Sequence, residues 1–394
     1  MTNPILETVD FAAIRAEFPR AADRLWLAAA ENHPFNRSAL DALERYTAYR
    51  TRGEKAPGCD FTLEMRAETK QMFADLISAN RDEIAFVQST TDGENIVIAG
   101  LDLERLGGNV VIDDLHFQAT KYMYTQLAEA GKIELRVVPH NNWQVDAEAY
   151  ADYIDEETRL VSIALVSHIN GFKLDVKRIS DLAHAKGAYL YADIIQGVGN
   201  TPIDVKAMGI DFAATSTYKW LMGEFGLGFL YVDEELQGEI VRKTRYGMRQ
   251  VESVDDFSFV NAPGAARYQG TGSMPYLQGV IVHAGLKLLS SIGVEAIRDH
   301  VRPLTERLQA TLPALGYQPI TPPGTDTPIV SYVPADLEET KRKLEAAFDH
   351  QVISFRTWHQ TTEAGEREAV RGIRLAPSVY NNEDDIEQFI AAVS

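Results

Sequence analysis

Between residues 83 and 232, short apolar runs alternate with longer segments whose apolar residues recur at helical spacing. Short runs bounded by turn-forming residues are typical of strands buried on both faces of a sheet. The runs predict seven strands: Glu83–Gln88, Asn109–Asp113, Glu134–Pro139, Leu160–Ser167, Ala188–Ala192, Phe212–Thr215 and Gly228–Val232. The intervening segments predict helices at Asp92–Leu101, Gln118–Ala130, Ala147–Ile154 and Ile179–Lys186. Strands that alternate with helices indicate parallel βαβ units and therefore an α/β fold.

The pattern changes after Val232. Residues 233–275 hold glycine, proline and polar residues with few periodic runs, which predicts a long irregular connection of functional importance. Beyond it we expect helices at Tyr276–Ser291, Val294–Thr311, Leu337–Asp349 and from Glu383, with strands at Ile329–Val333, Val352–Phe355 and Gly372–Leu375. We therefore predict a large α/β domain over residues 25–275 and a smaller α+β domain over residues 276–394, which also takes in residues 1–24.

Composition narrows the function classes. The chain has 394 residues, of which 45% are hydrophobic and 24% charged, as in ordinary globular proteins. Its net charge of −19 disfavours binding to nucleic acid. The single cysteine, Cys59, excludes an internal disulfide framework and a cysteine-rich metal site, and the histidines form no metal-binding motif. With no apolar run long enough to cross a membrane and no secretory signal, we expect a cytoplasmic enzyme without a metal and without a membrane partner.

The segment from Tyr189 to Val232 carries the most chemical information. Asp193 ends one apolar strand, and the run Ser216-Thr217-Tyr218-Lys219 follows the next strand along the chain, before a glycine-rich turn. Ligands bind beyond the carboxyl ends of the strands in open α/β sheets. Pyridoxal phosphate needs an amine for a Schiff base, a carboxylate for its ring nitrogen and donors for its phosphate. The segment therefore suits that cofactor.

The joint pattern of Asp193, Gln196 and Ser-Thr-Tyr-Lys at 216–219 resembles the class V aminotransferase family of fold-type I pyridoxal-phosphate enzymes. The resemblance covers about Leu25 to Ile390. It implies a mostly parallel seven-stranded sheet between helices, followed by a smaller C-terminal domain. It also implies that Lys219 forms the Schiff base and moves the α-proton, that Asp193 pairs with the pyridine nitrogen, and that Gln196 hydrogen-bonds the cofactor's phenolic oxygen.

The same resemblance implies a phosphate site. The turn Gln88–Gly93 is similar to the family's Thr-Thr-Glu turn, so that Thr90 and Thr91 would bind the phosphate at a helix N-terminus. Hydroxyl groups of Ser216 and Tyr218 would add to it. Thr271, in YQGTGSM, resembles the residue through which a neighbouring subunit caps the phosphate, which implies a homodimer with shared active sites.

At two further positions of the family pattern, this sequence offers two alternative residues. His116 aligns with the residue that stacks on the cofactor ring, with Phe117 as the alternative one position along. His168 stands where many members have asparagine, and Asn170 directly precedes the glycine, so either would approach the cofactor or the substrate.

Two arginines complete the implied site. Arg374, in GIRLAPSVYNNEDD, matches the arginine that binds the substrate carboxylate. Arg356 would be a second anion contact or would reach the substrate side chain.

For the reaction, the resemblance leaves several alternatives. Cysteine desulfurases carry a cysteine shortly before the arginine that corresponds to Arg374, but residues 359–371 contain none. We therefore favour β-elimination on a small amino acid, of the C–S lyase type, over persulfide formation. Transamination needs no further groups, whereas epimerisation needs a second acid or base, for which His116 and Tyr124 are the candidates. A dinucleotide-binding oxidoreductase is disfavoured because no G-x-G-x-x-G follows a predicted strand. A non-catalytic protein is disfavoured by the intact set of Asp193, Lys219 and Arg374.

Overall fold

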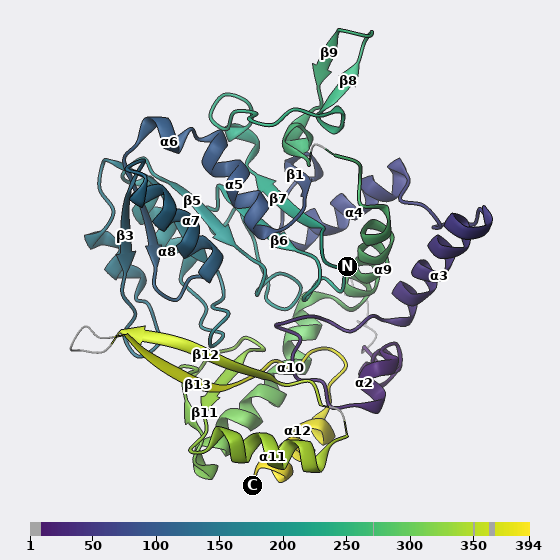
Figure 1. Cartoon of the computed structure of the whole chain (residues 1–394), viewed down its shortest axis with the longest axis vertical. Helices are drawn as coiled ribbons and strands as arrows, with labels where there is room; N and C mark the ends of the chain where they lie inside the picture. Colours follow the sequence, from purple (N-terminus) through teal and green to yellow (C-terminus); the bar gives the residue numbers. More distant parts are fainter. Residues whose placement is uncertain (1–8, 271, 350, 362–366) are drawn as a thin grey trace, which may run out of the picture.

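The structure, a computed structural model, describes residues 9–270, 272–349, 351–361 and 367–394. Its larger sheet has seven strands in the order β1-β7-β6-β5-β4-β2-β3 (Figure 1). The strands are β1 (Ile84–Val87), β2 (Asn109–Asp113), β3 (Glu134–Val138), β4 (Thr158–Ala164), β5 (Tyr189–Asp193), β6 (Phe212–Ser216) and β7 (Gly228–Val232). All seven predicted strands are present, and the expected mostly parallel sheet is confirmed.

Strand β7 runs in the opposite direction to both of its neighbours in the sheet. It pairs antiparallel with both β6 and β1, whereas β2 to β6 pair in parallel. The segment 217–227 between β6 and β7 is too short to return the chain to the starting edge, so the next strand comes back antiparallel. This short connection contains Lys219.

Helices cover both faces of this sheet because successive strand residues point to opposite sides. In β1, Ala85 and Val87 pack with α5 and α7, whereas Ile84 and Phe86 belong to the core that contains α4, α8 and α9. The bounds are α3 (Arg37–Arg52), α4 (Leu63–Leu76), α5 (Thr90–Gly100), α6 (Leu103–Leu106), α7 (Gln118–Glu129), α8 (Val176–His184) and α9 (Tyr276–Ile292). The helix predicted at Ala147–Ile154 is a 3₁₀ helix over Ala147–Asp152.

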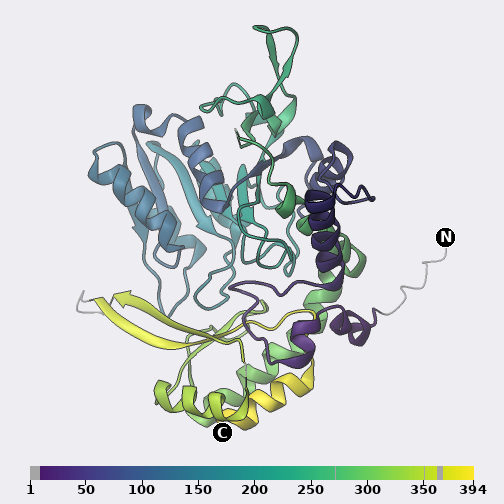
Figure 2. The same ribbon diagram turned by 45° about the vertical axis from the view of Figure 1, so that its right-hand side comes forward.

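The C-terminal part forms an antiparallel sheet in the order β10-β11-β13-β12, with helices packed against it (Figure 2). Its elements are α10 (Val294–Thr311), β10 (Gln318–Pro319), β11 (Val330–Val333), α11 (Leu337–Ala347), β12 (Ser354–Thr361), β13 (Arg367–Leu375) and α12 (Glu383–Val393). Two short N-terminal helices, α1 (Phe11–Ala16) and α2 (Pro19–Asp23), lie beside it. Leu25 and Leu27 pack into this smaller core, whereas α9 packs into the larger one. The division of domains at residue 275 stays a prediction.

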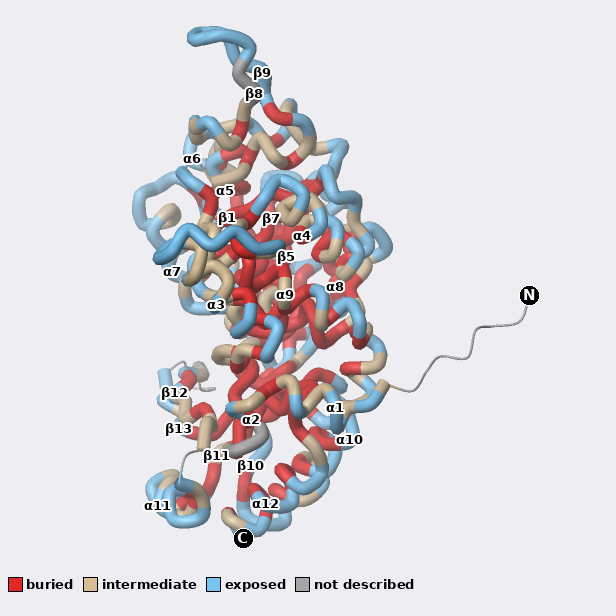
Figure 3. The backbone as a smooth tube through the Cα atoms, turned by 90° about the vertical axis from the view of Figure 1, so that its right-hand side faces the viewer, coloured by how far each residue is buried: buried red, intermediate tan, exposed pale blue. Residues whose placement is uncertain are grey.

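Within the segment predicted to be irregular, β8 (Val251–Ser253) and β9 (Phe259–Asn261) form a two-stranded hairpin. The hairpin projects from the body in all the ribbon views, and its end is coloured as exposed in Figure 3. Three 3₁₀ helices, Glu234–Leu236, Met248–Gln250 and Gly264–Tyr268, lie in the same segment.

In the part of the chain that the structure describes, no single helix is long and apolar enough to cross a membrane. The pair formed by α9 and the helical run Val294–Leu315 has the length and composition of a membrane span when the two helices are counted together. The pair is bent by 79°.

Candidate active site

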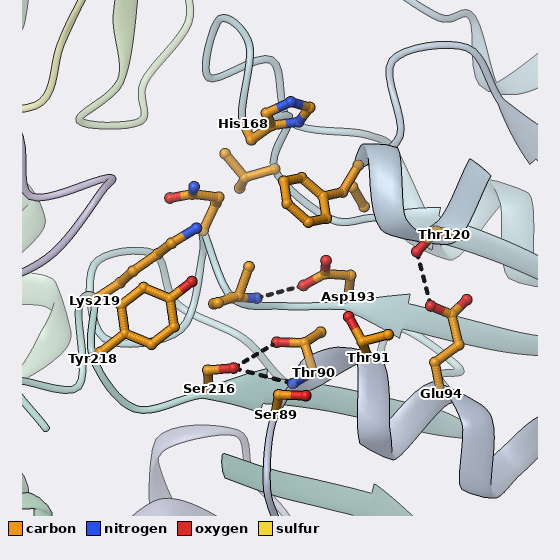
Figure 4. Close-up of a pocket in the computed structure, with 15 residues that line it drawn as sticks. Ser89, Thr90, Thr91, Glu94, Thr120, His168, Asp193, Ser216, Tyr218 and Lys219 are labelled. Carbon is orange, nitrogen blue, oxygen red and sulfur yellow. Dashed lines mark hydrogen bonds between the residues drawn. The ribbon is translucent and has the colours of Figure 1, made fainter. Parts of the chain in front are cut away.

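A pocket with about 650 Å³ of empty space lies beyond the carboxyl ends of β4, β5 and β6, next to the N-terminus of α5 (Figure 4). Segments distant in sequence meet here because the carboxyl ends of parallel strands share one edge of the sheet. The predicted site residues that line it are Thr90, Thr91, His168, Asp193, Gln196, Ser216, Tyr218 and Lys219.

The first turn of α5 forms one end of the pocket. Ser89 caps the helix by accepting a hydrogen bond from the backbone N–H of Asp92 (3.1 Å), and the N–H of Thr90 donates to Ser216 Oγ (3.0 Å). Gly93 lets the helix approach β6, because a Cβ at this position would lie 2.7 Å from that of Ala214. The hydroxyl groups of this turn and the positive end of the helix dipole suit an anion such as a phosphate.

Asp193 and Lys219 reach the pocket from β5 and from the turn after β6. Both side chains are buried, and Asp193 Oδ1 accepts a hydrogen bond from the backbone N–H of Ile195 (2.9 Å). Burial raises the pKa of Asp193, and the N–H bond and the charge of Lys219 partly oppose the shift. Burial also lowers the pKa of Lys219, and the charge of Arg374 adds to this effect. A lysine with a lowered pKa is more readily the neutral, nucleophilic amine.

Phe117 and His168 form a wall of the pocket. Their rings meet edge to face with centroids 5.1 Å apart. Burial and the charges of Arg374 and Lys219 hold the pKa of His168 well below its usual value, so the imidazole is neutral. Its Nδ1 is buried and has no hydrogen-bond partner among the described residues. This nitrogen is therefore available to a ligand.

His116 does not line the pocket, which contradicts its predicted ring-stacking position. Its Nδ1 accepts the backbone N–H of Phe117 (2.7 Å), and its Nε2 lies 3.3 Å from Ser162 Oγ. The turn after β2 directs His116 into the protein interior and Phe117, which precedes α7, into the pocket. Of the two alternatives, Phe117 therefore lines the pocket, whereas the contacts of His116 hold it in the interior.

Asn170 is also directed away from the pocket. Its amide nitrogen donates to the backbone oxygens of Trp143 (2.8 Å) and Ile320 (2.9 Å), and its oxygen accepts the N–H of Phe172 (3.1 Å). These bonds use both amide hydrogens, so Asn170 fixes the loop after β4. The prediction that it contacts substrate is not supported by its position.

Gln196 lines the pocket, and two hydrogen bonds within the protein hold its side-chain amide. Its nitrogen donates to the backbone oxygen of Ala30 (3.1 Å), and its oxygen accepts from the indole of Trp220 (3.0 Å). These contacts fix the orientation of the amide and leave its second N–H for a ligand. Its predicted bond to the phenolic oxygen of the cofactor stays a prediction.

A buried carboxylate that the sequence analysis missed, Glu94, also lines the pocket. It accepts hydrogen bonds from Ser162 (2.7 Å), Thr120 (2.8 Å) and Tyr124 (3.0 Å). Burial raises its pKa to about 7, against the effect of these three bonds. The only feature of the sequence that could have indicated Glu94 is that an acidic residue stands among the apolar residues of α5. Tyr124 belongs to this network and lies behind the pocket wall, so it is not placed as a second acid or base.

The two predicted substrate arginines lie on one face of the β12–β13 pair. Arg374 is 3% exposed and donates from Nη1 to the backbone oxygen of His168 (2.6 Å). Burial lowers its pKa to about 9, and Arg356 adds to the shift. Arg356 is paired with Glu31, a residue that the sequence analysis did not single out.

Thr271 and Cys59 are two further residues that the sequence analysis named. Thr271 lies outside the described residues, so its predicted role stays a prediction. Cys59 is buried, and the residues that line the pocket do not include it.

The donor set fits pyridoxal phosphate. The N-terminus of α5 with its hydroxyls would hold the phosphate, Asp193 would face the ring nitrogen, and Lys219 would bind the aldehyde carbon covalently. The unpartnered Nδ1 of His168 is a polar atom that such a ligand would satisfy. Fold and site together define a fold-type I pyridoxal-phosphate enzyme.

Comparison with known proteins gives the family. The model of the class-V aminotransferases matches residues 34–389, and the chain belongs to this family of pyridoxal-phosphate enzymes. A probable cysteine desulfurase of Methanothermobacter thermautotrophicus is 30% identical over 312 residues, which are 77% of this chain and 76% of that protein.

Solved structures share the fold. The apo cysteine desulfurase of Thermococcus onnurineus NA1 has a TM-score of 0.83 at 21% identity, covering 99% of this chain and 97% of that one. The cystine C–S lyase C-DES, solved with its product cysteine persulfide, has a TM-score of 0.83 at 20% identity, covering 95% and 98%. The solved structures that share this fold thus include both a cysteine desulfurase and a C–S lyase.

Proposed function

We propose that the protein catalyses β-elimination from a small amino acid that carries a leaving group at Cβ, as a C–S lyase does. The observation that carries this proposal is the buried pair of Lys219 and Asp193 in one pocket, while the chain's single cysteine lies elsewhere. Elimination requires the fewest groups beyond this pair.

In this proposal Arg374 binds the substrate carboxylate and so orients the Cα–H bond toward Lys219. The neutral amine of Lys219 takes the proton from Cα, and the Cβ substituent leaves with its bonding electrons. Bound pyridoxal phosphate supplies the electron sink for the charge that develops at Cα. Asp193 keeps the ring nitrogen protonated, and Phe117 covers one side of the site. Water then releases ammonia and a 2-oxo acid.

Cysteine desulfuration is the main competing reaction, since relatives of this chain carry that name. A persulfide held on this chain would need Cys59, because the sequence has no other cysteine. Cys59 is 6% exposed and the residues lining the pocket do not include it. This position supports elimination over transfer of sulfur to a protein thiol.

Product analysis with L-cysteine and L-cystine tests the reaction. We expect pyruvate and ammonia to form in equal amounts, with sulfur released as sulfide or persulfide, and Cys59→Ser to leave the rate unchanged. L-Alanine as the product, together with a loss of activity in Cys59→Ser, would instead establish desulfuration. Formation of glutamate only when 2-oxoglutarate is added would establish transamination.

We further propose that the protein is a homodimer. The β8–β9 hairpin carries apolar side chains with little protein around them: Phe257 is 95% exposed, Val254 65% and Val260 56%. An apolar patch of this kind on a projecting hairpin is typical of an interface. The hairpin belongs to the same irregular segment as Thr271, which the family pattern assigns to the neighbouring subunit's site. A second copy of this chain is therefore the proposed occupant.

Sedimentation of the Phe257→Asp variant tests the dimer. We expect the wild-type protein to sediment with the mass of two chains and Phe257→Asp to shift toward one chain, because an interface would bury the new charge. Tyr122→Asp, which places the same charge at another exposed aromatic residue, is the control and stays dimeric. A wild-type protein that is fully active as a monomer would contradict the proposal.

A further inference from the structure

Glu31 lies between Arg356 and Arg374, the two arginines that the family pattern assigns to the substrate. Its Oε1 pairs with Nη2 of Arg356 and lies 3.9 Å from Nη2 of Arg374. The two arginines are diagonal neighbours on one sheet face, because Arg356 stands opposite Gly372 while Arg374 stands opposite Ser354. The charge of Glu31 also acts on Lys219, whose pKa it raises against the effects of burial and of the arginines. Glu31 therefore belongs electrostatically to the active site.

The backbone holds Glu31 in this place from both sides. Ala29 donates its N–H to the backbone oxygen of Ala376 (3.1 Å), directly after β13. The oxygen of Ala30 accepts from Gln196, which lines the pocket, and the N–H of Glu31 donates to Ala28 (2.9 Å). The turn that carries Glu31 is thus tied to both the smaller sheet and the pocket. The backbone position of Glu31 is therefore fixed, and its carboxylate, 35% exposed, is held by the pair with Arg356.

Both arginines have a buried Nε without a partner among the described residues, but Glu31 lies much closer to Nη2 of Arg356 than to Nη2 of Arg374. Arg374 uses Nη1 on His168, while its Nε is buried without a partner among the described residues. Nε of Arg374 is therefore a donor without a protein acceptor in the described part of the chain, and its Nη2 has only Glu31 at 3.9 Å, so this edge is the one that can take a carboxylate in the bidentate geometry that guanidinium groups favour. Arg356 already has a carboxylate partner in Glu31. Two positive charges and one negative charge leave the equivalent of one positive charge for a ligand.

We propose that Glu31 determines substrate specificity by charge. It neutralises Arg356, so that Arg374 alone anchors a carboxylate and the site accepts amino acids with one carboxylate. An acidic side chain on the substrate would meet Glu31 instead of a free guanidinium, and this repulsion excludes it. The inference rests on the proposed role of Arg374 in binding the substrate carboxylate.

The test compares butyrate with succinate, which have the same chain length but carry one and two carboxylates. Neither has an amine, so neither reacts in the site. Dissociation constants are measured by calorimetry on the holoenzyme, for wild type and for Glu31→Gln. We expect Glu31→Gln to bind succinate about tenfold tighter or more, because Arg356 gains a charge-assisted contact, while butyrate affinity changes less than about threefold.

Two further variants make the result specific. Glu31→Gln combined with Arg356→Gln should lose the gain for succinate, because the freed guanidinium is gone. Glu148→Gln removes the same charge from a surface pair with Arg178 (2.5 Å) and should leave both dissociation constants as in wild type. A gain for succinate in Glu148→Gln as well would overturn the proposal, since the effect would then follow net charge alone.

The remaining outcomes separate this inference from the proposed function. An unchanged ratio of succinate to butyrate affinity in Glu31→Gln, or no measurable succinate binding to it, overturns the role of Glu31. Turnover of L-cysteine and of acidic amino acids is measured on the same proteins. A shifted affinity ratio without turnover of any amino acid would contradict the proposed reaction and leave the charge selection standing.

Discussion

Replacement of Lys219 by alanine is expected to abolish both turnover and the visible absorption of the lysine-linked cofactor. Lys219 is the buried amine of the pocket, and no other residue lining it carries an amine. The variant loses the covalent attachment and the base for the Cα proton together, so the rate should fall by at least about 10³-fold. Absorption spectra and initial rates with L-cysteine measure the two effects.

The matched control for this experiment is Lys70→Ala. Lys70, on α4, also has a pKa lowered by burial, to about 8, but it lies over the ring of Phe86 and the residues lining the pocket do not include it. The control should keep both the absorption and the rate. If Lys219→Ala retained either property while Lys70→Ala lost it, the wrong lysine would have been assigned.

The strand ends could be predicted from the sequence for a physical reason. Asp193 and Ser216 each end a continuous apolar run, and parallel strands bring such ends to one edge of the sheet without any knowledge of side-chain contacts. Lys219 follows from the same reasoning, because it lies three residues beyond β6. The apolar runs also gave all seven strands of the larger sheet.

Where side-chain direction depends on a turn, the sequence was insufficient. His116 and Phe117 are neighbours, and the turn after β2 decides which of them faces the pocket. That turn is set by the Asp113 carboxylate, which accepts the N–H of Leu115 (2.9 Å), a contact without a periodic signal. The direction of Asn170 depends instead on partners from two distant segments, which the sequence does not reveal either.

Two strands of the smaller sheet, β12 and β13, were predicted too short. β12 and β13 extend over Ser354–Thr361 and Arg367–Leu375, beyond the apolar runs, because their outer parts alternate with polar residues. Glu31 could not be predicted at all. Its position depends on pairing between the turn after Leu27 and the end of β13, elements at opposite ends of the chain.

Replacement of Asp193 by asparagine is expected to lower turnover by about 10²–10³-fold while the protein stays folded. Asparagine has nearly the same shape, and its side-chain oxygen can still accept the N–H of Ile195. What it loses is the negative charge that holds the ring nitrogen of the cofactor protonated. The negative charge that develops at Cα then loses an electrostatic stabilisation of a few kcal/mol.

Asp113→Asn separates this catalytic effect from a general effect of removing a buried carboxylate. Asp113 also ends a strand of the same sheet and is buried, but its partners are Tyr150 (2.8 Å) and the N–H of Leu115. This control should change the free energy of unfolding without a comparable loss in kcat. Urea unfolding and steady-state rates are measured on both variants. Equal losses of kcat in the two would mean that Asp193 does not face the cofactor ring, because only a residue at the reacting centre separates turnover from stability.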